Sequence, residues 1–96
     1  MQAANDNEAA WRDFHEANPE VYRLVEKFTK QAIDAGFKHY GAMSVLQRIR
    51  WHTQVETNDL SFKINNNHAP YYARHFMEQN PEHKGFFRTR RVGGTA

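Results

Sequence analysis

The chain contains no cysteine, so no disulfide can stabilise the fold that its 96 residues adopt. A chain of this length has room for one domain with one small hydrophobic core. Its 7 Phe, 4 Tyr and 2 Trp must supply much of that core, since each large ring removes about 150–250 Å² from water when buried. The lack of cysteine also excludes a thiolate nucleophile and a Cys-ligated metal site, and it fits a reducing cytoplasm.

Apolar residues recur at helical spacing in four segments. The most regular pattern predicts a helix over 19–35, which Asn18 should cap and Gly36 should end. Shorter helices are expected over 9–17, over 42–53 and from Asn66 or Asn67 to Gln79. The side chains that should face the core are Ala10, Trp11, Phe14, Val21, Leu24, Val25, Phe28, Ala32, Val45, Leu46, Ile49, Ala69, Tyr72, Ala73, Phe76 and Met77.

Two segments, 60–64 and 85–92, show the alternation of apolar and polar residues that is typical of strands. In the second segment Phe87 should lie on one face and Phe86 on the other. The order of elements predicts an α+β domain that is mostly helical and winged-helix-like, with about four helices and a short two-stranded antiparallel hairpin. We expect this domain over 10–92, between a flexible acidic tail (1–9) and a short flexible tail (93–96).

Charge is distributed unevenly, although the formal net charge is only +2. Residues 1–20 carry five acidic residues against one arginine, and the strongest basic run lies at Lys84, Arg88, Arg90 and Arg91. Such a run attracts phosphate backbones or acidic protein surfaces. A solubilising terminus, or arginines that prevent edge-to-edge strand pairing, would explain the same residues.

Arrangements for catalysis or metal binding are absent from the sequence. None of the six histidines is four residues from another, and the two serines, Ser44 and Ser61, do not lie in a GxSxG turn. No glycine-rich phosphate-binding motif is present either. We therefore expect no enzymatic activity, no metal and no cofactor.

The helix predicted from Asn66 or Asn67 to Gln79 would direct polar and ring-bearing side chains away from the core. Asn and Arg can read base edges, His and Tyr can bond phosphate oxygens, and the basic strand would follow as a wing. The predicted duplex-DNA contacts are Arg48, Arg50, Asn66, Asn67, His68, Tyr71, Arg74, His75, Lys84, Arg88, Arg90 and Arg91. An ordinary solvated helix face explains the same residues, and both Trp11 and Trp51 are expected in the core rather than as stacking platforms.

Several segments carry a resemblance to a known group of proteins. They are Phe14–Pro19, Ile49–Trp51, Phe62–His68, Tyr71–Arg74 and Gly85–Arg90. Together they resemble short proteins encoded by bacteriophages and prophages, over about residues 14–91. The resemblance implies a phage or prophage origin and a winged-helix fold.

Two functions are compatible with these patterns. The first is a transcription regulator or accessory factor that binds double-stranded DNA. The second is a non-enzymatic module that binds and modulates a host protein, because Tyr, Trp and Arg are favoured anchors of protein interfaces. No uncharged stretch approaches the roughly 20 apolar residues of a membrane span, so we expect a cytoplasmic protein. The sequence does not fix its oligomeric state, and a dimer is compatible with it.

Overall fold

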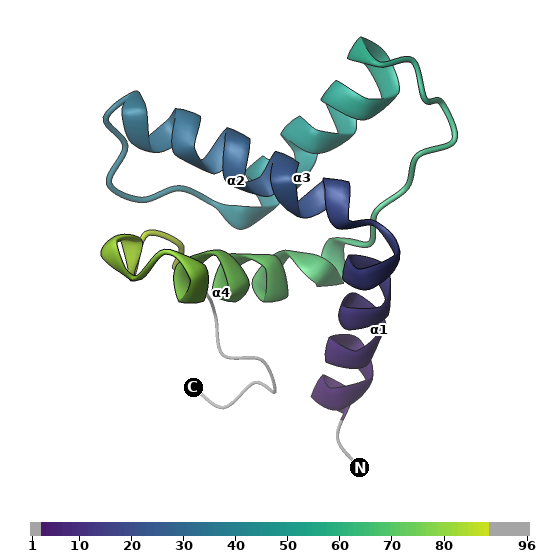
Figure 1. Ribbon diagram of the computed structural model, residues 1–96, viewed down its shortest axis with the longest axis horizontal. Helices are drawn as coiled ribbons and strands as arrows, with labels where there is room; N and C mark the ends of the chain where they lie inside the picture. The colour runs from purple at the N-terminus through teal and green to yellow at the C-terminus, as the bar shows by residue number, and fades with distance from the viewer. Residues whose placement is uncertain (1–2, 89–96) are drawn as a thin grey trace.

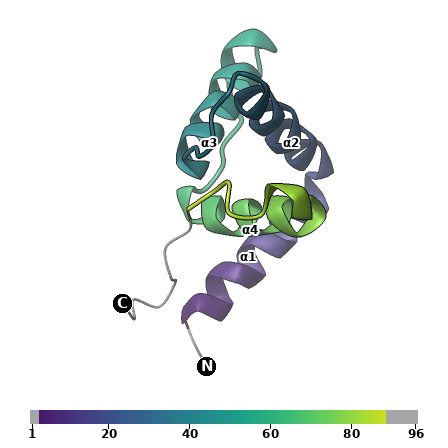
Figure 2. The same cartoon turned by 90° about the vertical axis from the view of Figure 1, so that its left-hand side faces the viewer.

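The structure is a computed structural model that describes residues 3–88. Its α-helices are α1 (Ala3–Ala17), α2 (Pro19–Asp34), α3 (Ala42–Trp51) and α4 (Ala69–Gln79). A π-helical segment, η1 (His52–Glu56), continues α3, and two 3-10 turns, η2 (Asn66–His68) and η3 (Pro81–His83), flank α4. Helices α2 and α3 cross in one layer, α4 lies beneath them, and α1 projects away from the start of α2 (Figures 1 and 2).

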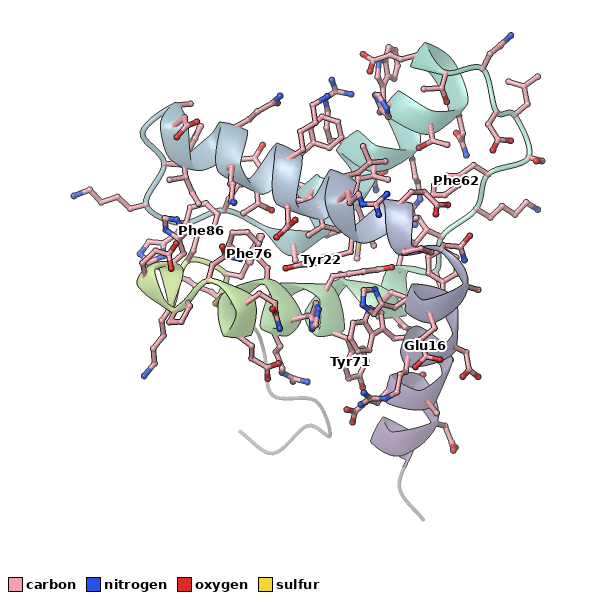
Figure 3. All side chains as sticks on the ribbon, in the orientation of Figure 1. Glu16, Tyr22, Phe62, Tyr71, Phe76 and Phe86 are labelled. Atoms are coloured by element: carbon pink, nitrogen blue, oxygen red, sulfur yellow. The ribbon has the colours of Figure 1, made fainter. Side chains whose placement is uncertain are left out.

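The core lies where α2, α3 and α4 face one another, and it is built from the predicted apolar positions. Val21, Val25 and Phe28 of α2 are buried, as are the predicted residues of α3. Phe76 of α4 is fully buried and points toward the α2–α3 layer (Figure 3). The mostly helical part of the prediction is therefore confirmed, whereas Ala10, expected to face the core, is exposed.

Two Asn-Pro steps end helices by the same local geometry. The Asn18 and Asn80 backbones both have φ −133°, and each side-chain amide donates to the carbonyl four residues earlier, Phe14 O at 3.0 Å and Phe76 O at 2.9 Å. Asn18 was expected to cap α2 with its side chain, but it closes α1 instead. Gly36 ends α2 as predicted, with a φ of +105° that favours glycine. Helix α1 begins at Ala3, so part of the expected acidic tail is helical.

The predicted strand over 60–64 is wrong. The alternation is partly kept, because Ile64 is buried and Phe62 is half-buried, but Leu60 is 81% exposed. Side-chain donors form hydrogen bonds to the carbonyl groups that would otherwise accept from a partner strand. Gln54 donates to Phe62 O at 2.8 Å, and Arg50 donates to Ile64 O at 2.7 Å. The backbone is therefore satisfied without a sheet.

The predicted strand over 85–92 is also absent as far as the structure describes it. Phe87 forms one isolated parallel bridge with Tyr40, and Tyr40 N–H donates to Phe86 O at 3.4 Å. Both Phe86 and Phe87 are buried, although Phe86 was expected on the outer face. Residues 89–92 lie outside the described residues, as does the predicted tail 93–96. Because residues 3–88 contain no strand, the α+β class and the two-stranded hairpin are wrong.

Candidate functional site

The face of α4 predicted to meet DNA is largely covered by α1. His68 and Tyr71 retain only 5% and 6% of their exposure. Trp11 of α1 stacks on the Tyr71 ring at 5.9 Å, and Phe14 lies 5.1 Å from the His68 ring. Burial of the Trp11 and Phe14 rings removes apolar surface from water, and this favours the packing of α1 on Tyr71 and His68. The predicted outward orientation of His68 and Tyr71 is therefore wrong.

The other predicted contacts at this end of α4 are only partly available to a ligand. Asn66 and Asn67 are exposed, while Arg74 and His75 are half-buried. The Arg74 guanidinium lies over the Tyr71 ring, 5.4 Å from its centroid. Asn65, rather than Asn66 or Asn67, caps the start of this segment, because its side-chain oxygen accepts from Asn67 N–H at 2.8 Å.

The basic residues near the C-terminus are described only in part. Lys84 and Arg88 are exposed. The chain turns back after η3, because the Phe87 ring lies 5.9 Å from Phe76 of α4. Arg90 and Arg91 lie outside the described residues. Of the predicted basic wing, the structure therefore describes two exposed side chains.

Arg48 and Arg50 have different structural roles. Arg50 reaches across to the loop before α4, where it donates to Ile64 O and to Asn66 Oδ1. Arg48 lies over the Phe28 ring at 4.4 Å and contacts Glu56 Oε1 at 3.3 Å, with 42% of its side chain exposed. Arg50 therefore holds the loop, and only Arg48 keeps a partly free guanidinium.

Replacing Arg50 by alanine is expected to lower the free energy of unfolding by about 1.5–3 kcal/mol, since a half-buried charged donor is lost from a carbonyl. Arg48→Ala is the matched control on the same helix and should cost no more than about 1 kcal/mol, because its ion pair is exposed. Urea unfolding followed by far-ultraviolet circular dichroism measures both. Equal losses for the two variants would contradict this assignment.

The large exposed apolar side chains fall at the two ends of α3. Before the helix, Phe37 and Tyr40 pack on each other with ring centroids 5.2 Å apart. After it, Trp51, Val55 and Leu60 are 57%, 54% and 81% exposed and lie within ten residues of one another. We call these last three residues the η1 patch. It is the larger apolar exposure, and its tryptophan does not contact another described ring.

The local helix geometry places Trp51 and Val55 on one side. Trp51 lies two residues beyond the buried Ile49, which turns its side chain by about 200° away from the core. Val55 follows four residues later, in η1. A π-helical turn contains more than four residues, so Val55 lies close to Trp51 on the same side of the helix. Asp59 N–H donates to Thr53 O at 3.0 Å, so the loop carrying Leu60 is tied to the same segment.

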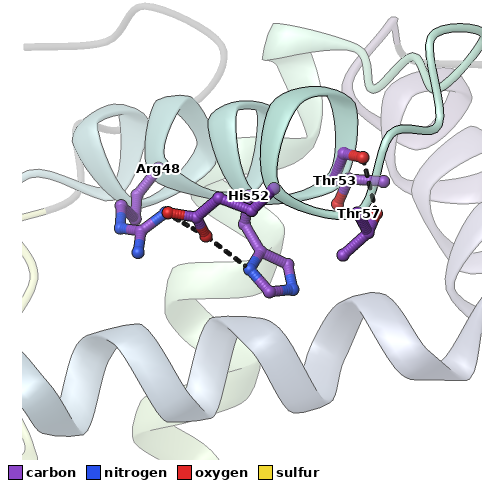
Figure 4. Close-up of polar contacts among 5 residues, drawn as sticks. Arg48, His52, Thr53 and Thr57 are labelled. Carbon is purple, nitrogen blue, oxygen red and sulfur yellow. Dashed lines mark hydrogen bonds and ion pairs between the residues drawn. The ribbon is translucent and has the colours of Figure 1, made fainter.

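A polar network joins the end of α3 to η1 and to the residue that follows it (Figure 4). His52 Nδ1 lies 2.8 Å from Glu56 Oε1, which also receives Arg48, and Thr57 Oγ1 donates to Thr53 O at 2.6 Å. The hydrogen bond with His52, aided by Arg48, lowers the pKa of the Glu56 carboxyl. The charges beside the patch thus neutralise one another within the protein.

A groove of about 460 Å³ lies between the start of α2, the segment η1 and the loop after it. Val21, Leu24 and Phe62 give it an apolar floor, and its rim carries both signs of charge through Glu20, Arg23 and Asp59. His52, Thr53 and Thr57 of the η1 network line the same groove. The groove and the η1 patch therefore share one segment of backbone.

Comparison with protein-family models, with curated proteins and with solved structures returned no match to this chain. No helix over residues 3–88 combines the length and the apolar character needed to cross a membrane. Sequence reasoning missed the η1 patch, because it assigned Trp51 to the core by residue type. The available signal was its offset from the Val45, Leu46 and Ile49 stripe.

Proposed function

We propose that the protein is a non-enzymatic interaction module that docks a partner protein on the η1 patch. The observation that carries this proposal is the exposure of Trp51, Val55 and Leu60 at the C-terminal end of α3 and just after it. Tryptophan is the residue type most enriched among the side chains that dominate binding energy in protein interfaces. A cluster of exposed large apolar residues is also costly in water unless a partner covers it.

The chemistry of the patch favours an apolar protein surface as its partner. Beside the patch, the Glu56 carboxylate contacts both Arg48 and His52, so the partner need not supply a compensating charge. The three side chains of the η1 patch are uncharged, so they offer no cation to a phosphate backbone. The adjoining groove gives a partner a second apolar surface, formed by Val21, Leu24 and Phe62. We propose a host protein in the cytoplasm, which fits the phage-type origin that the sequence resembles.

Duplex-DNA binding is the competing prediction. It depended on a free helix face that contains His68 and Tyr71, and α1 packs on that face. Of the two arginines predicted to contact phosphates from α3, Arg50 is engaged with the protein's own backbone. The remaining support for DNA is the exposed pair Lys84 and Arg88 with the basic residues that follow. Fewer of the predicted contacts are therefore available than the sequence implied.

Site-specific photocrosslinking in bacterial host cells tests the proposal. A photoreactive phenylalanine derivative is placed at Trp51 or Val55, and at Phe37 as the control, because Phe37 is an exposed ring (53%) at the other end of α3. We expect one defined protein adduct from positions 51 and 55, resistant to nuclease, and none from position 37. Absence of an adduct from 51 and 55, an adduct with nucleic acid, or one with only a second copy of this chain would contradict the proposal.

A further inference from the structure

Two histidines from different helices lie in ring contact where α1 meets the rest of the molecule. The rings of His15 on α1 and His75 on α4 have centroids 5.0 Å apart in an edge-to-face arrangement. Trp11 stacks on His15 at 5.1 Å with an interplanar angle of 7°, and Tyr22 of α2 lies 4.7 Å from His75. Tyr72 adds a further ring 5.9 Å from His15. The contact between α1 and the other helices is thus built around two imidazoles.

Aromatic rings, rather than acids, line this contact. His15 Nδ1 is buried and has no hydrogen-bond partner among the described residues. The charged groups around the pair are Arg12 and Glu16 on α1, Glu20 and Glu26 on α2 beside the two tyrosines, and Arg74 and Glu78 on α4. Glu16 is exposed, and no ion pair joins a carboxylate to either histidine in the part of the chain that is described.

Burial and neighbouring charge therefore oppose the charging of His15 while α1 is docked. Burial lowers the pKa of His15, the nearby His75 lowers it further, and the partial compensation by Glu16 is opposed by Arg12. Burial also lowers the pKa of His68, which lies against Phe14 of the same helix. Two imidazolium ions with ring centroids 5.0 Å apart would repel each other in a partly desolvated site.

We propose that His15, in ring contact with His75, is an acid-sensitive contact, which holds α1 on α4 while its ring is neutral and releases it when the ring is protonated. A histidine whose pKa is lower in the docked state stabilises docking above its ordinary pKa, near 6.5, and loses this contribution as the pH falls below that value. Release of α1 would uncover Tyr71 and His68, the α4 face that α1 covers in the structure. This device does not depend on the η1 patch.

The expected size of the effect follows from proton linkage. Between neutral pH and pH 5, the equilibrium constant for release of α1 rises by at most about 30-fold through His15, the limit set by the ordinary histidine pKa. Helices α2, α3 and α4 should stay folded over this range, because their shared core is apolar and contains no buried carboxylate among the residues described.

Tryptophan fluorescence tests the proposal in the full chain. Trp51→Phe leaves Trp11, which is 6% exposed, as the only tryptophan, so that emission excited at about 295 nm reports on it alone. Between pH 8 and pH 5 we expect the Trp11 emission maximum to move to longer wavelength, while the helical circular dichroism signal falls by no more than the share of the 15-residue α1. The double variant His15→Phe, His75→Phe keeps two aromatic rings that cannot be protonated, and it should lose most of the pH-dependent shift in Trp11 emission. His15→Gln serves if that pair packs poorly, and the exposed His39→Phe is the matched control.

Three results would overturn the proposal. The first is a Trp11 emission maximum that stays constant from pH 8 to pH 5. The second is a shift that persists in full in both the double phenylalanine variant and His15→Gln. The third is a parallel loss of most of the helical signal, because this would show unfolding of α2, α3 and α4 as well as release of α1.

Discussion

Replacing Phe76 by alanine is expected to lower the free energy of unfolding by about 3–5 kcal/mol. Phe76 is fully buried at the centre of α4, with its ring 5.9 Å from Phe87 and 6.1 Å from His83. Removing a buried phenylalanine side chain costs about 3–5 kcal/mol, because contact area is lost and a cavity remains. A domain of this size has a total stability of only about 5–10 kcal/mol, so the loss is a large fraction of it.

Equilibrium unfolding in urea, followed by far-ultraviolet circular dichroism, measures this loss. Phe37→Ala provides the control, since the same ring is removed from a position that is 53% exposed. The control should change the free energy of unfolding by about 0.5 kcal/mol or less. If Phe76→Ala lost less than about 1 kcal/mol, the packing of α4 against α2 and α3 would have to be different.

Trp51→Ala should have the opposite profile, with a large effect on binding and a small one on folding. The side chain is 57% exposed and contacts no other described ring, so the free energy of unfolding should change by about 0.5 kcal/mol or less. Its loss from the centre of an interface typically costs about 2–4 kcal/mol, which corresponds to about 30- to 700-fold in affinity.

Isothermal titration with the partner identified by crosslinking measures the affinity. Phe37→Ala again serves as the matched control and should bind within about twofold of the unchanged protein. A Trp51→Ala protein that kept its affinity would remove the η1 patch as the docking surface. A Trp51→Ala protein that unfolded would instead show that Trp51 packs against the core.

The sequence predicted helices correctly where the spacing of apolar residues marks one buried face. The apolar stripes of α2, α3 and α4 mark faces that water disfavours, and the buried Val25, Ile49 and Phe76 follow from their spacing. The Asn-Pro steps and Gly36 mark helix ends through local backbone chemistry. These features depend on neighbouring residues, so they can be recognised without knowing how the helices pack.

The predictions that failed depended on contacts between distant segments. Alternation over 60–64 is compatible with a strand, but Arg50 and Gln54 of the preceding helical segment take the carbonyls of Ile64 and Phe62. His68 looked polar in the sequence, yet it is buried because α1 supplies Phe14 as a neighbour. No local pattern encodes which helix will lie across another.

The candidate site was missed for a related reason. Tryptophan is buried more often than exposed, and this holds for Trp11 at 6% but not for Trp51 at 57%. The helical phase of Trp51 relative to Ile49 already indicated an outward side chain. The prediction for Trp51 followed from its residue type, although its position in the helical repeat decides which side of an amphipathic helix its side chain occupies.

The two indole N–H signals in a ¹⁵N-correlated spectrum test the central claim most directly, because Trp51 lies in the η1 patch and Trp11 lies beneath the covered face of α4. On titration with the partner protein, the Trp51 signal should shift or broaden while the Trp11 signal stays in place. A shift of Trp11 with Trp51 unchanged, or a response of Trp11 to duplex DNA when no protein partner moves Trp51, would contradict docking on the η1 patch.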